Sequence, residues 1–237
     1  MNLKTNLTLI NFTKGRIGQT IKYIVIHYTA NNGDTAKGNS NYFHSVNRSA
    51  SAHYFVDENE VVQVVKDSDT SWHCALKKDK NGNYIFQGNS GHTYAGLCTN
   101  SNSIGIEMCS DKVNGKFVIT EETQRNTIEL VRILMKKYNI PIKNVIRHYD
   151  VTGKICPEPF VRDESQWNEF KKRIARLEEE EMVKRYDKVN ELPKSLQAEV
   201  QELVNIGALK GDENGNLNIT EDMARCLIIN KRYTDNK

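Results

Sequence analysis

The sequence predicts an α/β fold for most of the chain, followed by a small and mostly helical module at the C-terminal end. Three observations support this fold class. Runs of β-branched and aromatic residues, bounded by turn-forming residues, recur between positions 22 and 108. A segment with a helical apolar period and recognisable end signals follows at residues 120–139. Further capped helical patterns occupy residues 186–237.

The expected strands are recognised by their residue pattern. They lie at residues 22–28, 51–57, 60–65, 103–108 and 145–147. The D-E-N-E turn between the second and third strands suits a tight hairpin. In the fourth strand, alternation places Ile104 and Ile106 on one face. Ser103, Gly105 and Glu107 then point to the opposite face.

The expected helices of the larger part lie at residues 35–47, 120–139 and 167–182. In the first of them we expect Tyr42, Phe43 and Val46 to face inward. The second begins with Thr120 as its N-cap, carries acidic residues in its first turn and ends on lysines, which complements the helix dipole.

The run E-E-E-E-M-V-K-R at the end of the third helix is typical of a solvated linker. Beyond it, Ser195 or the nearby Pro193 opens a helix that Gly207 ends, and Thr220 caps another. The expected divisions are a first domain at residues 1–178, a charged linker at residues 179–185 and a second module at residues 186–237.

Composition excludes several classes of protein. The chain has 237 residues, a formal net charge of +3 and a pI near 8.5. This charge is far from the dense basic stripe of a nucleic-acid-binding protein, so we expect no nucleic-acid partner. No run approaches the roughly 18 apolar residues of a membrane span, so no membrane partner is expected. The five cysteines lack the spacing of a disulfide framework, and the N-terminal stretch lacks the apolar core of a secretory signal.

The segment V-I-R-H-Y-D-V-T-G-K-I-C-P at residues 145–157 gathers His148, Lys154 and Cys156. Imidazole nitrogen and thiolate sulfur are ligands that zinc prefers. A catalytic zinc takes three protein ligands and keeps a fourth position open, so a third ligand must come from elsewhere. His27 is the best candidate because it ends a buried strand, and sites commonly form at strand ends.

Four separated blocks carry a resemblance to a known family: I-V-I-H-Y-T, S-A-H-Y-F-V-D-E-N-E-V-V-Q-V-V, N-S-I-G-I-E-M and H-Y-D-V-T-G-K-I-C-P. Over residues 20–175 the chain resembles the zinc-dependent N-acetylmuramoyl-L-alanine amidases of type 2, a group shared by phage endolysins, bacterial autolysins and peptidoglycan-recognition proteins. The resemblance implies a central mixed β-sheet flanked by helices, with Zn²⁺ as cofactor and bacterial peptidoglycan as substrate. A zinc-activated water would cleave the amide bond between N-acetylmuramic acid and L-alanine.

The resemblance also implies roles for individual residues. His27, His148 and Cys156 fall on the positions of the zinc ligands. Glu107 would lie beside the metal-bound water as the general base, which gives a use to a carboxylate that is costly on a mostly buried strand. Lys154 lies two residues before Cys156, as in the family motif, and would stabilise the oxyanion.

Four further residues are candidate substrate contacts: His53, Trp72, His73 and Asn102. Alternation leaves His53 either pointing to the site or packing under the sheet. Trp72 either lines a groove wall or belongs to the core, and the adjacent His73 is expected to contact substrate. The stretch at residues 76–102 is dense in Gly, Asn and Ser, so we expect it to form a flap over the groove.

Alternative functions stay open on the sequence. Cys156 with His148 as its base would make a cysteine peptidase, and a non-catalytic peptidoglycan-binding protein would share the fold. The C-terminal module has L-P-x-x-L and I-G-A-L-K-G segments similar to surface-layer-homology-like modules. We expect it to bind the cell wall, with homo-oligomer formation as the alternative. A phage or prophage endolysin of this kind is made in the host cytoplasm and released through a separately encoded membrane hole, whereas a host autolysin would need another route of export.

Overall fold

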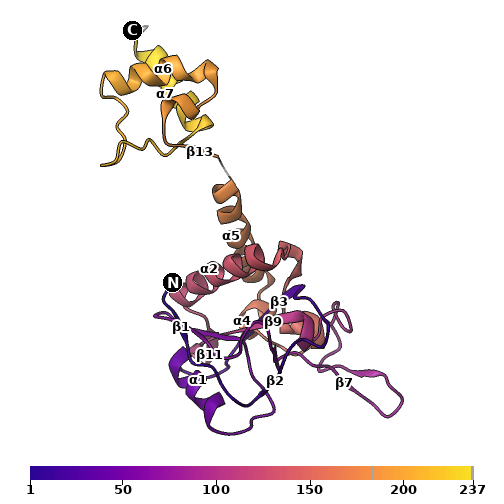
Figure 1. Ribbon diagram of the computed structural model, residues 1–237. Helices are drawn as coiled ribbons and strands as arrows, with labels where there is room; N and C mark the ends of the chain where they lie inside the picture. The colour runs from indigo at the N-terminus through magenta and orange to yellow at the C-terminus, as the bar shows by residue number, and fades with distance from the viewer. Residues whose placement is uncertain (183, 236–237) are drawn as a thin grey trace. The chain divides into compact units, whose positions relative to one another are not determined.

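A mixed six-stranded sheet forms the centre of the larger part of the chain, as expected (Figure 1). The computed structural model describes residues 1–182 and 184–235, and the chain divides into two compact units between Arg176 and Leu177. The strand order is β1-β5-β4-β9-β3-β12, and all neighbours are parallel except β4 and β5, which form the expected hairpin. The strands are β1 (Leu3–Thr5), β3 (Tyr23–Tyr28), β4 (Tyr54–Val56), β5 (Val61–Gln63), β9 (Ser103–Met108) and β12 (Val145–Arg147).

Alternation along the strands gives this sheet two different faces. On one face, Ile26 of β3 and Ile106 of β9 are fully buried in a large apolar core with α2 (Glu121–Tyr138) and α5 (Glu164–Met182). Thr120 caps α2 by accepting a hydrogen bond from the backbone of Thr123, as predicted. This face contains the main apolar core, so the chemistry-bearing side chains of β3 and β9 are left to the opposite face.

The opposite face is covered in part by α1 (Ala36–Ser45), which lies across the sheet from α2 (Figure 1). Phe43 of α1 stacks on Phe55 of β4, with ring centroids 5.3 Å apart. The prediction that Tyr42 and Val46 also face inward is wrong, because they are 50% and 46% exposed. The helix instead turns Ala36, Ser40 and Phe43 toward the sheet, a spacing that excludes their neighbours from the same face.

Further short elements lie between the sheet strands or follow the last of them in the chain. They are β2 (Phe12–Thr13), β6 (Thr70–Ser71), β7 (Lys77–Lys78), β8 (Tyr84–Ile85), η1 (Asn100–Asn102), β10 (Asp111–Val113), β11 (Lys116–Val118), η2 (Ile142–Asn144), α3 (His148–Thr152) and α4 (Glu158–Arg162). The stretch expected to form a flap contains the β7–β8 hairpin. It is tied to α3 by backbone hydrogen bonds from Gln87 to Thr152 and from Tyr94 to Asp150.

The second unit has a small core of its own. Leu196, Val200 and Leu203 of one helix pack there with Ile219 and Ile228. Its elements are β13 (Arg185–Tyr186), η3 (Val189–Glu191), α6 (Lys194–Asn205), β14 (Ile219–Thr220) and α7 (Glu221–Asp235). As predicted, Thr220 caps α7 by accepting a hydrogen bond from the backbone of Met223 at 3.1 Å.

The predicted linker at residues 179–185 lies partly within α5, whose backbone is helical through Met182. Val183, in the same predicted linker, lies outside the described residues. Among the helices that the structure describes, none is both long and apolar enough to cross a membrane.

Candidate metal centre

Two neighbouring parallel strands bring the first half of the site together. His27 of β3 and Glu107 of β9 are direct cross-strand partners in the sheet register. Both side chains leave the sheet on the face opposite the main core, as alternation predicts for Glu107. Their side chains meet there, with His27 Nδ1 3.9 Å from Glu107 Oε1.

The segment after β12 supplies the second half. His148 is the first residue of α3, and the left-handed Gly153 (φ +77°) ends that short helix. The backbone N–H of Tyr149 then donates to the carbonyl of Cys156 at 3.0 Å, which folds the loop back on the helix. This closure brings Cys156 beside His148, although seven residues separate them in the chain.

The structure thus gathers His27, His148 and Cys156, all buried, with one potential ligand atom of each within 4.8 Å of the others. His27 Nδ1 lies 3.8 Å from Cys156 Sγ, and the rings of His27 and His148 have centroids 4.6 Å apart. Imidazole nitrogen and thiolate sulfur are ligands that zinc prefers, and a catalytic zinc takes three protein ligands. These residues are therefore a possible metal site.

Two buried polar atoms support that assignment. Within the described part of the chain, neither His148 Nδ1 nor Glu107 Oε2 has a hydrogen-bond partner. A buried polar atom without a partner is costly, and it commonly marks a position where an ion or water belongs. The residues present therefore fit a metal ion held by His148 Nδ1, with Glu107 beside it.

The protonation of the three candidate ligands follows from their burial. Burial, reinforced by His148 and His73, lowers the pKa of His27 well below its ordinary value. Burial and Lys154 lower the pKa of His148 to about 3. Both imidazoles are therefore neutral near pH 7, with lone pairs available for a metal. Burial raises the pKa of the Cys156 thiol, so metal binding must release its proton.

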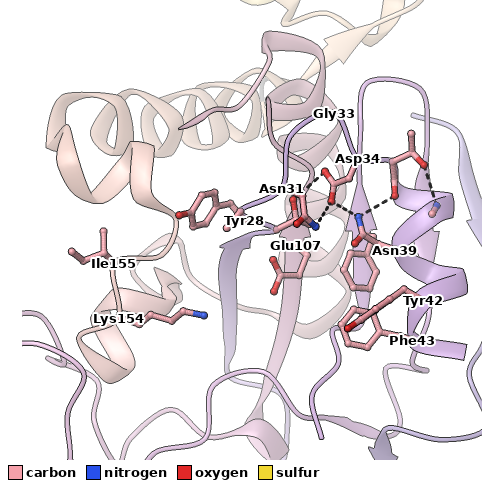
Figure 2. Close-up of a pocket in the computed structure, with 15 residues that line it drawn as sticks. Tyr28, Asn31, Gly33, Asp34, Asn39, Tyr42, Phe43, Glu107, Lys154 and Ile155 are labelled. Atoms are coloured by element: carbon pink, nitrogen blue, oxygen red, sulfur yellow. Dashed lines mark hydrogen bonds between the residues drawn. The ribbon is translucent and has the colours of Figure 1, made fainter. Parts of the chain in front are cut away.

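Glu107 and Lys154 face the same cavity of about 700 Å³ (Figure 2). Burial raises the pKa of Glu107 to about 8, with Lys154 opposing the shift and Asp34 adding to it. A carboxyl group whose pKa lies near neutral pH is suited to take up and return a proton. In Figure 2 the Lys154 side chain extends into the cavity toward Glu107.

The far wall of this cavity was not expected from the sequence. It is formed by α1 and the loop before it, with Asn39, Tyr42 and Phe43 among the lining residues (Figure 2). Asp34 holds this wall together, because its carboxylate accepts hydrogen bonds from Thr29 at 3.1 Å and from Asn39 at 2.6 Å. Tyr42, exposed on α1, is thus a cavity residue and not a core residue.

The candidate substrate contacts His53, Trp72, His73 and Asn102 do not line the cavity beside Glu107. His53 is fully buried next to His73, and its Nδ1 accepts the backbone N–H of Gly105 at 3.0 Å. Trp72 lines a separate cavity of about 360 Å³. Substrate contact by these four residues stays a prediction.

Of the other two candidates, His73 lies against a candidate metal ligand and Asn102 lies in the η1 turn. His73 contacts His27 directly, with His73 Nδ1 3.0 Å from His27 Nε2. Asn102 is mostly buried and closes the η1 turn, because its side chain accepts the N–H of Thr99 at 2.8 Å and donates to Leu97. One sequence signal for the position of His73 is Gly105, since a glycine inside a strand often marks a close approach by another group.

Comparisons with known proteins found a matching family and similar chains. The family described as "N-acetylmuramoyl-L-alanine amidase" matches residues 17–159. A probable N-acetylmuramoyl-L-alanine amidase of Bacillus licheniformis is 38% identical over 161 residues, which cover 66% of this chain and 42% of that protein. The amidase CwlL of the same species is 36% identical, with 66% and 41% coverage. The chain thus spans about two fifths of the length of these relatives. The solved structure of a mutant endolysin from Bacillus subtilis is 26% identical, covers 73% of this chain and 99% of its own, and has a TM-score of 0.55.

Proposed function

The chain belongs to the N-acetylmuramoyl-L-alanine amidase family, and we propose that it cleaves the amide bond between N-acetylmuramic acid and L-alanine in bacterial peptidoglycan. The observation that carries the proposal is the buried cluster of His27, His148 and Cys156 beside Glu107, which itself lines a cavity. A phage or prophage endolysin is the proposed biological context, in keeping with the similar endolysin structure.

Zinc is the proposed metal, and when bound it would supply Lewis-acid chemistry at the scissile carbonyl and at the attacking water. His27, His148 and Cys156 would hold it. Glu107 would accept the proton of the attacking water on its carboxylate and return it to the leaving nitrogen. Lys154 Nζ would donate hydrogen bonds to the carbonyl oxygen as negative charge develops there.

The test is the release of soluble fragments from purified Gram-positive peptidoglycan, with new amino termini and new reducing ends assayed separately. We expect L-alanine amino termini without reducing ends, a signal that chelation abolishes and added zinc restores. New reducing ends would indicate a glycosidase instead. If no bond is cut under any condition, the chain is a non-catalytic peptidoglycan-binding protein.

The cysteine-peptidase alternative is disfavoured by the surroundings of the sulfur. Cys156 is 2% exposed, so its Sγ has little access to a substrate carbonyl. Burial also raises the pKa of the thiol, which keeps it protonated when no metal is bound. Because the thiolate is the nucleophilic form, this environment opposes nucleophilic attack by Cys156.

Replacing Lys154 with alanine should lower the rate of amide hydrolysis by roughly 10² to 10³, the usual effect of removing one donor to an oxyanion. Zinc content and thermal stability should stay at wild-type values, because Lys154 is exposed and is not a candidate ligand. Lys136→Ala, at an exposed position near the end of α2, is the matched control. Activity kept with zinc lost would reassign Lys154 to a structural role.

We further propose that residues 186–237 bind the cell wall, because their L-P-x-x-L and I-G-A-L-K-G segments are similar to surface-layer-homology-like modules. This part of the chain also has an apolar core of its own. Val200→Asp would place a charge in that core, where Val200 is fully buried, and should unfold the module. Retention on purified walls in a sedimentation assay should then fall several-fold, while cleavage of a small soluble muramyl peptide is unchanged. The control is Gln201→Asp, at the adjacent exposed position. Equal retention of all three proteins would remove the wall-binding role.

A further inference from the structure

We propose that His73 is a positioning residue, which acts with Ser103 and the carbonyl of Thr99 to hold His27 in the tautomer that leaves its Nδ1 free for a metal. The inference rests on the proposed metal centre. It concerns a contact that connects the candidate ligand, on β3, to the turn that precedes β9. The directions of three successive hydrogen bonds carry the argument.

The chain of hydrogen bonds begins at a group that can only accept. The backbone carbonyl of Thr99 lies 2.6 Å from Ser103 Oγ. Ser103 must therefore donate its single hydroxyl hydrogen to Thr99. Ser103 Oγ can then only accept in its contact with His73 Nε2, which lies 3.0 Å away.

The donor in that second contact is thus His73 Nε2–H. A neutral imidazole carries one ring hydrogen, so His73 Nδ1 is left as an acceptor. His27 Nε2 lies 3.0 Å from His73 Nδ1 and must donate to it. The lone pair of His27 is consequently on Nδ1, the atom that lies 3.8 Å from Cys156 Sγ. A histidine ligand whose other nitrogen donates a hydrogen bond is the usual arrangement in metal sites.

The surroundings hold the His73 ring in this position. A β-carbon on Gly105 would lie 2.6 Å from His73 Cγ, so the ring rests against β9 at a place that only glycine leaves open. The backbone N–H groups of His73 and Cys74 both donate to Asn100 Oδ1, at 3.1 and 2.8 Å. Thr99, Asn100 and Ser103, which lie in the η1 turn or next to it, therefore all help to hold His73 in place. Cys74 Sγ, 3.9 Å from His73 Nε2, is a more distant neighbour.

The experiment reads the tautomer and the metal affinity separately. In the metal-free full-length protein, ring ¹⁵N chemical shifts should show His27 protonated on Nε2 and unprotonated on Nδ1. His73→Leu removes the acceptor and should lower zinc affinity by about 10- to 100-fold, the usual cost of losing an outer partner of a ligand. Ser103→Ala should lower it by about tenfold, at the lower end of that range. Affinity is measured by competition with a chromogenic chelator.

His73→Asn is the variant that separates hydrogen bonding from packing. Its amide oxygen stands as many bonds from Cβ as Nδ1 does in histidine, so it can still accept from His27 Nε2–H. The zinc affinity of His73→Asn should lie within a few-fold of the wild-type value. Because asparagine fills less space than leucine, this result would show that the hydrogen bond, and not packing, maintains the affinity. The control is His44→Leu, which removes an imidazole from α1 and should leave the zinc affinity at the wild-type value.

Three results would overturn the inference. They are a proton on His27 Nδ1 in the wild type, wild-type zinc affinity in His73→Leu, or equal losses in the leucine and asparagine variants. The tautomer is measured without metal or substrate, so it also stands if the protein proves not to be an amidase. If the wild type has the Nε2–H tautomer of His27 but cleaves no amide bond, the result contradicts the proposed function and leaves this inference standing.

Discussion

Replacing Cys156 with alanine should abolish zinc binding and amide hydrolysis together. The thiol is the only sulfur in the candidate ligand set, and only His27 and His148 would remain. Removing a ligand itself should cost more than the roughly 10- to 100-fold loss of affinity typical of removing an outer partner. We expect an affinity loss above about 100-fold and no detectable amide cleavage, measured by metal analysis after gel filtration and by release of L-alanine amino termini.

The matched control is Cys109→Ala, which removes another buried thiol from the core next to α1. That variant should keep its zinc and lose only some stability. Both the metal mechanism and a thiol mechanism predict an inactive Cys156→Ala protein, so the wild type must also be assayed in excess chelator. Full activity there would establish the cysteine nucleophile, and zinc retained by Cys156→Ala would remove the sulfur from the ligand set.

Glu107→Gln should keep zinc and lose activity by about 10² to 10⁴, the contribution typical of a general acid–base group. Glutamine fills the same space but cannot take up a proton from the attacking water. The rate of amide cleavage and the zinc content are measured on the same sample. Glu122→Gln on the exposed surface of α2 serves as the control. An active Glu107→Gln protein would assign the proton transfer to another group.

The same variant should change how the stability of the metal-free protein depends on pH. In the folded protein, burial raises the pKa of Glu107 from 4.5 to about 8. Between those values the folded state keeps a proton that the unfolded state has lost, so the free energy of unfolding falls as pH rises. The slope is at most about 1.4 kcal/mol per pH unit. Burial of His27 and His148 lowers the pKa of both side chains and adds a slope of the opposite sign, which the wild type and Glu107→Gln share. Urea unfolding of the chelated proteins between about pH 5 and pH 8 should therefore show a free energy of unfolding that falls more steeply, or rises less steeply, with pH in the wild type than in Glu107→Gln. Parallel slopes would mean that Glu107 titrates near its ordinary value.

Much of the sheet could be predicted because apolar and polar residues alternate along a strand according to which of its faces is buried. Ile104 and Ile106 pack in the main core, and Glu107 lies on the other face of the sheet, as the pattern predicted. The candidate metal ligands His148 and Cys156, after β12, could be recognised because their side chains are of types that zinc prefers and they lie close together in the sequence. The pairing of His27 with Glu107 depends on strand order, which local patterns do not encode.

The cavity wall and the environment of His73 could not be predicted for a related reason. The wall depends on Asp34, whose partners include Asn39 at the start of α1 and Ser110 beyond β9. These are ordinary polar residues with no distinctive spacing. The sequence suggested His73 as a substrate contact because it follows Trp72. Nothing in the local sequence indicates which residue the His73 side chain contacts. Its contact with His27 exists only after two distant segments come together.

The lengths of the outer strands have a consequence for behaviour at high concentration. Both edges of the central sheet, β1 and β12, are three residues long. Exposed sheet edges are where strands of separate molecules can pair and start aggregates, and short edges present few free backbone groups for such pairing. The short edges of this sheet therefore favour colloidal stability at high protein concentration. The long central strands β3 and β9 are enclosed between their neighbours.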